Sequence, residues 1–405
     1  MSRRFVITRV EIAGQKPLVC GVFEEHHMLE VQCIPENAPS QILNNIYVGR
    51  VSQVVKNIGA AFVEIEKGKK CFLPLSDIRQ PVYVKRMTEK QPLSQGDELL
   101  VQVVREAVKT KDPQVSTNLS LAGAYSVVTS GERRLGVSEK IDPVKREALR
   151  ERVKSVYDRQ LGVIVRTNAA DLKENESDIL ISEIRSLQEQ MQAIISYAPY
   201  RKIYSVIYQA LPEYIRLLQN QPFEQLAEIV TDDAEIFAEL TAFADMHPSI
   251  KLHLYEDEQL DLHKLYSIQV QLERALQKKI WLKSGANLLI EPTEAMTVID
   301  VNSSKNIKKS RPEEQHLQIN LEAAAEIAAQ LRLRNISGII IIDFIDMVSE
   351  KDKEQLLSAM RSFVRSDPVK TEVIDLTRLG LMELTRKKTR RPLQEQLNLS
   401  DPDGK

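Results

Sequence analysis

Residues 337–355, SGIIIIDFIDMVSEKDKEQ, join the most apolar run of the chain to two aspartates. Four consecutive isoleucines lead directly into Asp343, and Asp346 follows three residues later. A run of β-branched residues predicts a buried strand. An ionised carboxylate is costly to remove from water unless it is paired, hydrogen-bonded or bound to a metal. The stretch therefore predicts a strand that carries Asp343 to the rim of a sheet, where it belongs to a site.

A second strand with a carboxylate lies upstream, in PTEAMTVIDVNSS at residues 292–304. Because side chains alternate along a strand, Val298, Asp300 and Asn302 share one face. The helix predicted between the two strands, over residues 316–335, has an apolar side made of Leu321, Ala324, Ala325, Ile327, Ala328 and Leu331. If the strands are parallel, Asp300 and Asp343 emerge at the same edge of one sheet, where open α/β sheets place their sites.

Two carboxylates and an amide form a set of hard oxygen ligands that suits Mg²⁺, which takes few protein ligands and keeps its waters. Such a site can polarise a phosphodiester. The alternative is that these aspartates are helix caps or salt-bridge partners, and spacing alone does not decide between the two. Asp346, on the other side of the strand line, is interpreted as a hydrogen-bonded structural residue.

Composition excludes several classes of protein. The 405 residues carry a net charge of −2, so nucleic-acid binding requires local basic patches. The start lacks the apolar core of a signal peptide, and no apolar run reaches the length of a membrane span, which favours a cytoplasmic protein without membrane contact. Cys20, Cys33 and Cys71 stand apart, so buried thiols are expected rather than zinc ligands or disulfides. Nucleotide-binding glycine motifs are absent.

The residue pattern, and with it the predicted secondary structure, changes several times along the chain. Residues 45–119 hold about five short strands with Gly and Pro turns, including a hairpin at EKGKK, and this pattern suits an OB-type barrel. A charged helix is predicted to begin near Pro143. From about residue 204 helices and strands alternate, and residues from 271 onward form the last α/β part.

Several long motifs cover almost the whole chain: NIYVGRVSQVVKNIGAAFVEI, CFLPLSDI, TNLSLAGAYSVV, GVIVRT, TEAMTVIDVNSS, INLEAAAEIAAQLRLRNISGIIIIDFIDM and TRLGLMELTRKK. In sequence and in order they closely resemble the ribonuclease E/G family of bacterial endoribonucleases. The resemblance implies a multidomain α/β (α+β) architecture. Its expected parts are a discontinuous RNase H-like subdomain (1–36 and 204–270), an OB-fold RNA-binding domain (37–119), a 5′-sensor region (120–203) and a DNase I-like catalytic subdomain (271–400).

By motif position, the resemblance assigns metal binding to Asp300 and Asp343 and places Asn302 in the catalytic site. The cofactor implied is Mg²⁺, with Mn²⁺ as a substitute. In this family the RNase H-like part is not catalytic, so Asp232 and Asp233 are expected to cap a helix.

Three residues of the barrel are implied to contact RNA. Phe62 and Phe72 lie on strands that flank a basic turn, where aromatic rings stack on bases of any sequence. Core packing is the alternative for both rings. Lys111 matches the family's RNA-contacting lysine, although TKDP replaces a glycine-containing loop; a solvated lysine is the alternative.

The 5′-monophosphate pocket of the family maps to Arg166 and Thr167, with a backbone amide from Val127. Arginine suits a phosphate because its N–H groups engage two oxygens at once. The alternative is a salt bridge at the strand end. The basic stretch LTRKKTRRPL at residues 384–393 is read as a solvated helix face or, next to the site, as a phosphate contact.

The resemblance implies an Mg²⁺-dependent endoribonuclease that cleaves single-stranded RNA, such as mRNA or rRNA precursors. It would leave 5′-phosphate products and prefer 5′-monophosphorylated substrates. The alternative is a catalytically weak RNA-binding or assembly protein that keeps the fold. No CPxC motif is present, so no zinc is expected and a homodimer would use the catalytic subdomain itself. Ser304 stands where the family usually has glycine.

Overall fold

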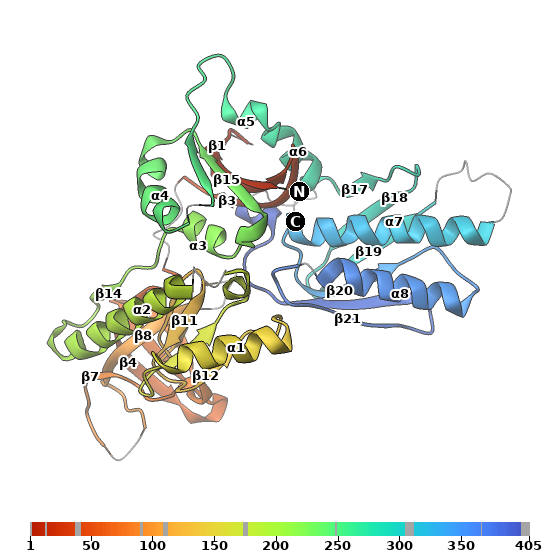
Figure 1. Ribbon diagram of the computed structural model, residues 1–405. Helices are drawn as coiled ribbons and strands as arrows, with labels where there is room; N and C mark the ends of the chain where they lie inside the picture. Colours follow the sequence, from red (N-terminus) through yellow and green to blue (C-terminus); the bar gives the residue numbers. More distant parts are fainter. Residues whose placement is uncertain are drawn as a thin grey trace. The chain divides into compact units, whose positions relative to one another are not determined.

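The computed structural model describes most of the chain, namely residues 2–12, 14–36, 42–89, 92–107, 112–172, 177–247, 249–303, 312–365 and 367–397. Lys111 and Ser304 fall outside these ranges. The chain divides into two units, one made of residues 1–38 and 225–405 and the other of residues 39–224 (Figure 1). The fold is of the mixed α/β class.

The second unit begins with a closed barrel. Its five strands, in the order in which they pair, are β4 (Ile46–Val55), β5 (Ala60–Glu66), β6 (Lys69–Pro74), β9 (Gln114–Ser116) and β8 (Glu98–Arg105). The barrel closes because β8 also pairs with β4. This agrees with the OB-type barrel expected from the sequence. The predicted hairpin at residues 66–70 is also confirmed, with Gly68 at a φ of 83° in the turn between β5 and β6.

The barrel is narrow and filled by side chains. Alternate positions on its strands point inward, and Val63, Leu73, Leu99 and Val101 are fully buried there. A Cβ on Gly49 would lie 2.5 Å from Val63 Cγ1, so only glycine allows β4 to approach β5 this closely. Two short strands extend the barrel sheet at its edges, β7 (Tyr83–Lys85) beside β8 and β14 (Val206–Tyr208) beside β4.

A four-stranded sheet follows the barrel in the same unit. Its order is β10 (Ser120–Ala122), β11 (Ser126–Thr129), β13 (Gly162–Val165) and β12 (Leu135–Val137). Helices α1 (Pro143–Lys154) and α2 (Ser177–Tyr197) pack against it. Helix α1 begins where the sequence predicts, because the Asp142 side chain accepts a hydrogen bond from Val144 N. The unit also contains α3 (Glu213–Gln219), so residues 204–224 lie with the barrel.

The first unit contains a five-stranded sheet built from both ends of the chain. Its order is β16 (Lys251–Leu254), β15 (Leu226–Thr231), β1 (Arg3–Arg9), β2 (Leu18–Glu24) and β3 (His27–Ile34). Strand β1 pairs with β15 in parallel and with β2 in antiparallel orientation. The helices of this region are α4 (Ala234–Met246), α5 (Leu262–Leu265), α6 (Ile268–Leu276) and α9 (Leu393–Gln396). Side chains of α5, α6 and α9 share one apolar core with β1, β2 and β3.

The second sheet of this unit has six strands. Their order is β17 (Lys279–Trp281), β18 (Asn287–Pro292), β19 (Met296–Asn302), β20 (Gly338–Asp343), β22 (Leu381–Arg386) and β21 (Thr371–Leu376). Strands β19 and β20 are parallel and are joined through helix α7 (Pro312–Leu333), as the sequence predicts. Helix α7 lies beside α8 (Glu350–Arg365), and both cover one face of the sheet (Figure 1).

The buried stripe of α7 differs by one residue from the prediction. Ala323 and Ala324 are fully buried, whereas Ala325 is exposed. Three consecutive alanines give no local signal to fix the phase of the helix, so its rotation follows from Ile327 and Leu331, which fill the core. Apart from the buried Asn287, the alternate residues of β18, β19 and β20 on the opposite face of the six-stranded sheet are half-buried or exposed.

Asp232 and Asp233 have different roles. Asp233 caps α4 as expected, with its carboxylate accepting from Glu235 N at 3.0 Å and Ile236 N at 3.2 Å. The cap assignment for Asp232 is wrong, because its carboxylate accepts a 2.6 Å hydrogen bond from the Thr8 hydroxyl on β1. Asp232 therefore ties β15 to its parallel neighbour.

His247, at the end of α4, makes the stability of the first unit depend on pH. Burial lowers the pKa of its imidazole from 6.5 to about 4, and its ring lies 4.4 Å from that of Phe243. The neutral form is therefore favoured in the folded state. We expect up to about 3 kcal/mol of stability to be present above pH 6.5 and lost as the pH falls through 4. Comparing urea unfolding of the wild type and His247→Gln across this range tests it, and parallel pH profiles would contradict it.

Candidate functional site

Asp300 and Asp343 come together at the carboxyl ends of two parallel strands. They are register partners, with Asp300 on β19 directly opposite Asp343 on β20. Neighbouring strands lie about 4.8 Å apart, and residues in register point to the same face. The predicted meeting of these two aspartates at one sheet edge is confirmed. Asp300 is half-buried and Asp343 is exposed, so both carboxylates are accessible.

Asn302 holds one of these carboxylates in place. It shares a strand face with Asp300, and its Nδ2 donates to Asp300 Oδ2 at 2.6 Å. This bond takes one lone pair of the carboxylate and restricts its rotation.

The site concentrates negative charge. Partial burial, and then the charges of Asp300 and Asp346, raise the pKa of Asp343. Asp346 thus acts electrostatically on Asp343, although its place after β20 had indicated a structural role only. Its backbone carbonyl lies 3.1 Å from His316 Nδ1 on α7. A cation between Asp300 and Asp343 would relieve their repulsion.

Asn320 is a positioning residue that the sequence analysis missed. It is fully buried on α7, donates to the Ile345 carbonyl at 2.8 Å and accepts from Ile345 N at 3.0 Å. These two bonds fix the chain just after Asp343. The signal in the sequence is an amide that falls on the apolar stripe of α7, three residues before Ala323.

The donor set fits a hard divalent cation with few protein ligands. Within the described ranges, no three His, Cys, Asp or Glu side chains gather as a metal-binding group. Two carboxylates, one of them oriented by an amide, are the kind of set that Mg²⁺ uses while keeping several waters.

Phe62 and Phe72 form an aromatic pair on the outside of the barrel. They are register partners on β5 and β6, with ring centroids 6.1 Å apart in an edge-to-face arrangement. Both rings are half-buried, whereas the alternate residues Val63 and Leu73 are fully buried inside. Their placement on the outer face disfavours the core-packing alternative. The backbone N–H of Phe72 donates to the carbonyl of Pro113.

Arg166 follows β13 and is held by two elements of the second unit. Its guanidinium donates to the carbonyl of Gly123 and to Asn220 Oδ1. These bonds use two of its five N–H groups. Burial lowers the pKa of Arg166, and the charge of Glu183 opposes this effect. The neighbouring Thr167 hydroxyl is exposed and lies 2.9 Å from Ser138 Oγ.

Glu183 on α2 organises the turn beside Arg166. Its carboxylate accepts hydrogen bonds from Ala124 N at 2.8 Å, Tyr125 N at 3.0 Å and the Ser126 hydroxyl at 2.7 Å. Burial raises the pKa of Glu183, and these hydrogen bonds partly offset the rise. A Cβ on Gly123 would lie 2.4 Å from the Glu183 carboxyl carbon, so glycine is needed there. The sequence analysis missed Glu183, since a glutamate on a charged helix gives no such signal.

Val127 lies inside β11, between two partner strands. It is in register with Ala122 of β10 and Ile164 of β13. Arg166 directly follows β13 of the same sheet, and its backbone N–H donates to the carbonyl of Tyr125. The structure thus brings the turn at residues 123–126, Val127 and Arg166 into one neighbourhood.

The basic stretch at residues 384–393 is neither a helix nor wholly solvated. Arg386 ends β22 and is buried in an ion pair with Asp367, whose Oδ2 lies 2.7 Å from its Nε. Arg390 donates to Gln32 Oε1 at 2.9 Å. Lys387 and Lys388 are exposed. The reading of the whole stretch as a solvated or phosphate-binding run is therefore wrong for Arg386.

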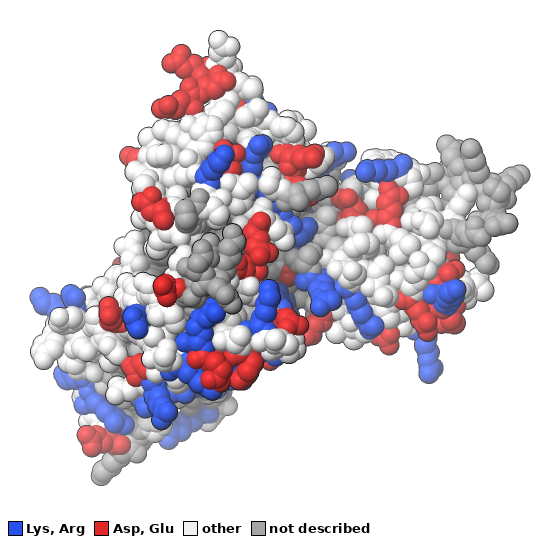
Figure 2. All heavy atoms as spheres, viewed as in Figure 1, with Lys and Arg blue, Asp and Glu red and all other residues white. Residues whose placement is uncertain are grey.

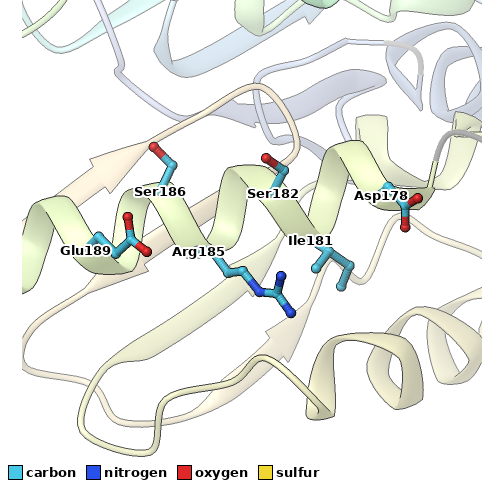
Figure 3. Close-up of a pocket in the computed structure, with 6 residues that line it drawn as sticks. All are labelled: Asp178, Ile181, Ser182, Arg185, Ser186 and Glu189. Atoms are coloured by element: carbon cyan, nitrogen blue, oxygen red, sulfur yellow. The ribbon is translucent and has the colours of Figure 1, made fainter.

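Other surface features do not compete with the sheet edge. Acidic and basic side chains are interspersed on the face shown in Figure 2, in line with the net charge of −2. A surface hollow runs along α2, lined by Asp178, Ile181, Ser182, Arg185, Ser186 and Glu189 (Figure 3). All six come from successive turns of one helix, and the hollow shares no residue with the sites above. Across the described ranges, the helices are too short or too polar to cross a membrane.

Comparison with known proteins adds to this geometry. Residues 41–118, which hold the barrel, match the S1 RNA binding domain, and residues 120–389 match the Ribonuclease E/G family. The chain is 34% identical to Ribonuclease G of Salmonella typhimurium over 390 residues, covering 93% of this chain and 78% of that protein. It is 33% identical to Ribonuclease G of Escherichia coli with the same coverage. Ribonuclease E of Synechocystis sp. is 33% identical over 95% of this chain and 57% of its own length. The chain belongs to the ribonuclease E/G family.

Proposed function

We propose that this protein is an Mg²⁺-dependent endoribonuclease that cleaves single-stranded RNA, such as mRNA or rRNA precursors, and leaves 5′-phosphate products. The observation that carries the proposal is the register pairing of Asp300 and Asp343, with the Asn302 amide bonded to Asp300. Family membership supports RNA as the substrate, since the relatives are named ribonucleases. We further propose that the six-stranded sheet with α7 and α8 is a DNase I-like subdomain and the five-stranded sheet an RNase H-like one.

Each residue of the site has a separate task in this proposal. Asp300 and Asp343 would hold Mg²⁺, which would supply polarisation of the scissile phosphodiester. Asn302 fixes the orientation of the Asp300 carboxylate, so the cation position is set before RNA arrives. Water forms a bond to phosphorus and gives up a proton to solvent while the P–O3′ bond breaks. The 3′ oxygen takes up a proton to become a hydroxyl, and the phosphate stays on the downstream fragment. The chain groups thus position the cation and the RNA.

In this proposal the barrel binds the RNA strand. Phe62 and Phe72 lie on its outer face, where the two rings can stack on bases at roughly 1–3 kcal/mol each. Such stacking tolerates any sequence, which suits an enzyme that takes many RNAs. We also propose Lys111 as an RNA contact, on the basis of the motif match alone.

Incubation of the purified protein with a 5′-monophosphorylated single-stranded RNA tests the proposed activity. We expect internal cleavage with Mg²⁺, no cleavage with EDTA, and downstream products that a 5′-phosphate-dependent exonuclease degrades. Binding without cleavage at any Mg²⁺ or Mn²⁺ concentration would favour the catalytically weak RNA-binding protein instead.

The 5′-end preference gives a second test of the proposal. We propose that Arg166, Thr167 and the amide of Val127 receive a 5′-monophosphate. The N–H groups that Arg166 does not use on Gly123 and Asn220 would then bind phosphate oxygens. RNA with a 5′-monophosphate should be cut faster than the same RNA with a 5′-triphosphate or 5′-hydroxyl. Arg166→Gln should reduce this preference by about tenfold, since a charged hydrogen bond contributes about 1.5–3 kcal/mol.

A matched control separates phosphate binding from structural support. Asn220→Ala removes one partner of the guanidinium but keeps its charge, so the preference should survive in this variant. The slower cleavage that ignores the 5′ end should be equal in both variants. Equal rates on all three substrates in the wild type would contradict the proposed pocket.

A further inference from the structure

Strand β17 carries an exposed aromatic ring covered by a lysine. Trp281 is the single tryptophan of the chain and its side chain is 62% exposed. The Lys279 ammonium lies 4.3 Å from the centre of its ring. The Lys279 ammonium therefore covers one face of the indole ring, and the contact holds the ammonium beside the ring. One exposed hydrophobic residue is ordinary on a protein surface, so the position of this ring in the sheet decides its meaning.

Both residues lie on the same sheet face as the proposed catalytic pair. Lys279 is in register with Leu289 of β18, which is in register with Asp300. Trp281 is in register with Asn287, which is in register with Asn302. Residues in register share a face. The intervening Ile280 packs against the apolar core under α7 and α8, which confirms that its two neighbours point the other way.

The distances suit one RNA strand that contacts both places. Trp281 lies two strands away from Asn302, which is about 10 Å at the usual spacing of strands. The next row on this face runs through Glu291, Val298, Ile341 and Glu383 in register. Its two carboxylates would repel phosphates. We therefore expect an RNA strand to cross the open face at the carboxyl ends of β19 and β20, where Asp300 and Asp343 lie. Lys279 and Trp281 lie beside this path.

We propose that Trp281 and Lys279 form a subsite for single-stranded RNA bound at Asp300 and Asp343. A base stacks on the side of the indole that Lys279 leaves open, and the ammonium contacts a neighbouring phosphate. Stacking on an aromatic ring accepts any base, and a lysine reads only charge. The subsite would hold the strand in place at the cleavage site rather than select a sequence. This inference rests on the proposed endoribonuclease function.

Because the chain has one tryptophan, tryptophan fluorescence excited outside the tyrosine absorption band reports on this place alone. The full-length Asp343→Asn variant, which should cut RNA slowly, would be titrated in Mg²⁺ with a short single-stranded RNA, with binding followed in parallel by the anisotropy of a labelled RNA. We expect saturable quenching of tryptophan fluorescence that follows the anisotropy curve. When Lys279→Met is added to this variant, the negative slope of log K against log salt concentration should become shallower by about 0.7, the value for one phosphate contact. Saturated binding with unchanged fluorescence would overturn the proposal.

Cleavage kinetics give an independent readout. In the wild-type background, Trp281→Ala should raise KM between about fivefold and a hundredfold, the range expected for one base stack, while Trp281→Phe should restore most of the affinity. Tyr200→Ala is the matched control, because Tyr200 is an aromatic residue with 84% exposure outside the proposed sites. If the wild type is active and Trp281→Ala has a normal KM, the subsite is refuted but the enzyme function is not. An inactive wild type that still shows quenching would refute the enzyme function and support the subsite.

Discussion

Replacing Asp300 or Asp343 with asparagine should slow RNA cleavage by about a hundredfold or more. Either change removes one of the two charges that would hold Mg²⁺, while the size of the side chain stays nearly the same. The effect should appear in single-turnover rates measured at saturating RNA. Because the barrel lies in the other unit, RNA affinity measured in EDTA should stay within about twofold of the wild type.

Glu291→Gln provides the matched control for this experiment. Glu291 is an exposed carboxylate on the same sheet face, one row away from the aspartate pair. The same loss of charge there should leave cleavage almost unchanged. If both aspartate variants cleave RNA at the wild-type rate, the assignment of the metal site is wrong.

Arg386→Met should destabilise the first unit by about 3–5 kcal/mol, the usual effect of removing one partner from a buried ion pair. Arg386 and Asp367 have side chains that are only 2% and 3% exposed. Arg386 also donates to Asn335 Oδ1 at 2.9 Å and to the Ile336 carbonyl at 3.0 Å. Its loss leaves the Asp367 carboxylate buried without its counter-charge. Trp281 fluorescence during urea unfolding measures the effect, since Trp281 lies in the same sheet.

Two further variants define the cause of this loss. In Arg386→Met combined with Asp367→Leu, no charge stays buried, so much of the stability should return. Lys370→Ala breaks the exposed pair of Lys370 and Glu372, and its effect should be under about 0.5 kcal/mol. An Arg386→Met midpoint equal to that of the wild type would contradict the role of the buried pair.

The strand–helix–strand arrangement around the aspartates could be predicted because its signals are local. Residues 339–342 are β-branched and apolar, and the helix before them repeats its apolar residues with helical spacing. A crossover helix of this length is typical of parallel strands, and parallel strands align their carboxyl ends. The meeting of Asp300 and Asp343 at one edge could therefore be predicted for parallel strands, whereas their exact register is known only from the structure.

The contacts that the sequence analysis missed join residues that are distant in the chain. Asp232 binds Thr8, 224 residues away, and Glu183 binds the Ser126 hydroxyl, 57 residues away. Arg386 sits in a run of cations whose composition indicates solvent, yet its neighbour in space is Asp367. No local pattern distinguishes such a side chain from a solvated one. The partner becomes visible only when the sheet order is known.

The five-stranded sheet of the first unit has a consequence for the order in which the protein is made. Strands β1, β2 and β3 leave the ribosome before β15, but β1 needs β15 as its parallel neighbour. At 5–20 residues per second, the 224 residues between Thr8 and Asp232 take roughly 10–45 s to synthesise. The barrel unit can fold entirely within that interval, since residues 39–224 are continuous. The backbone N–H of Cys33 gains its hydrogen-bond acceptor even later, because that acceptor, Gln396 Oε1, lies 363 residues further along the chain. The nascent β1–β3 strands therefore have an open strand edge until β15 is made, the kind of surface that ribosome-associated chaperones shield from wrong pairing.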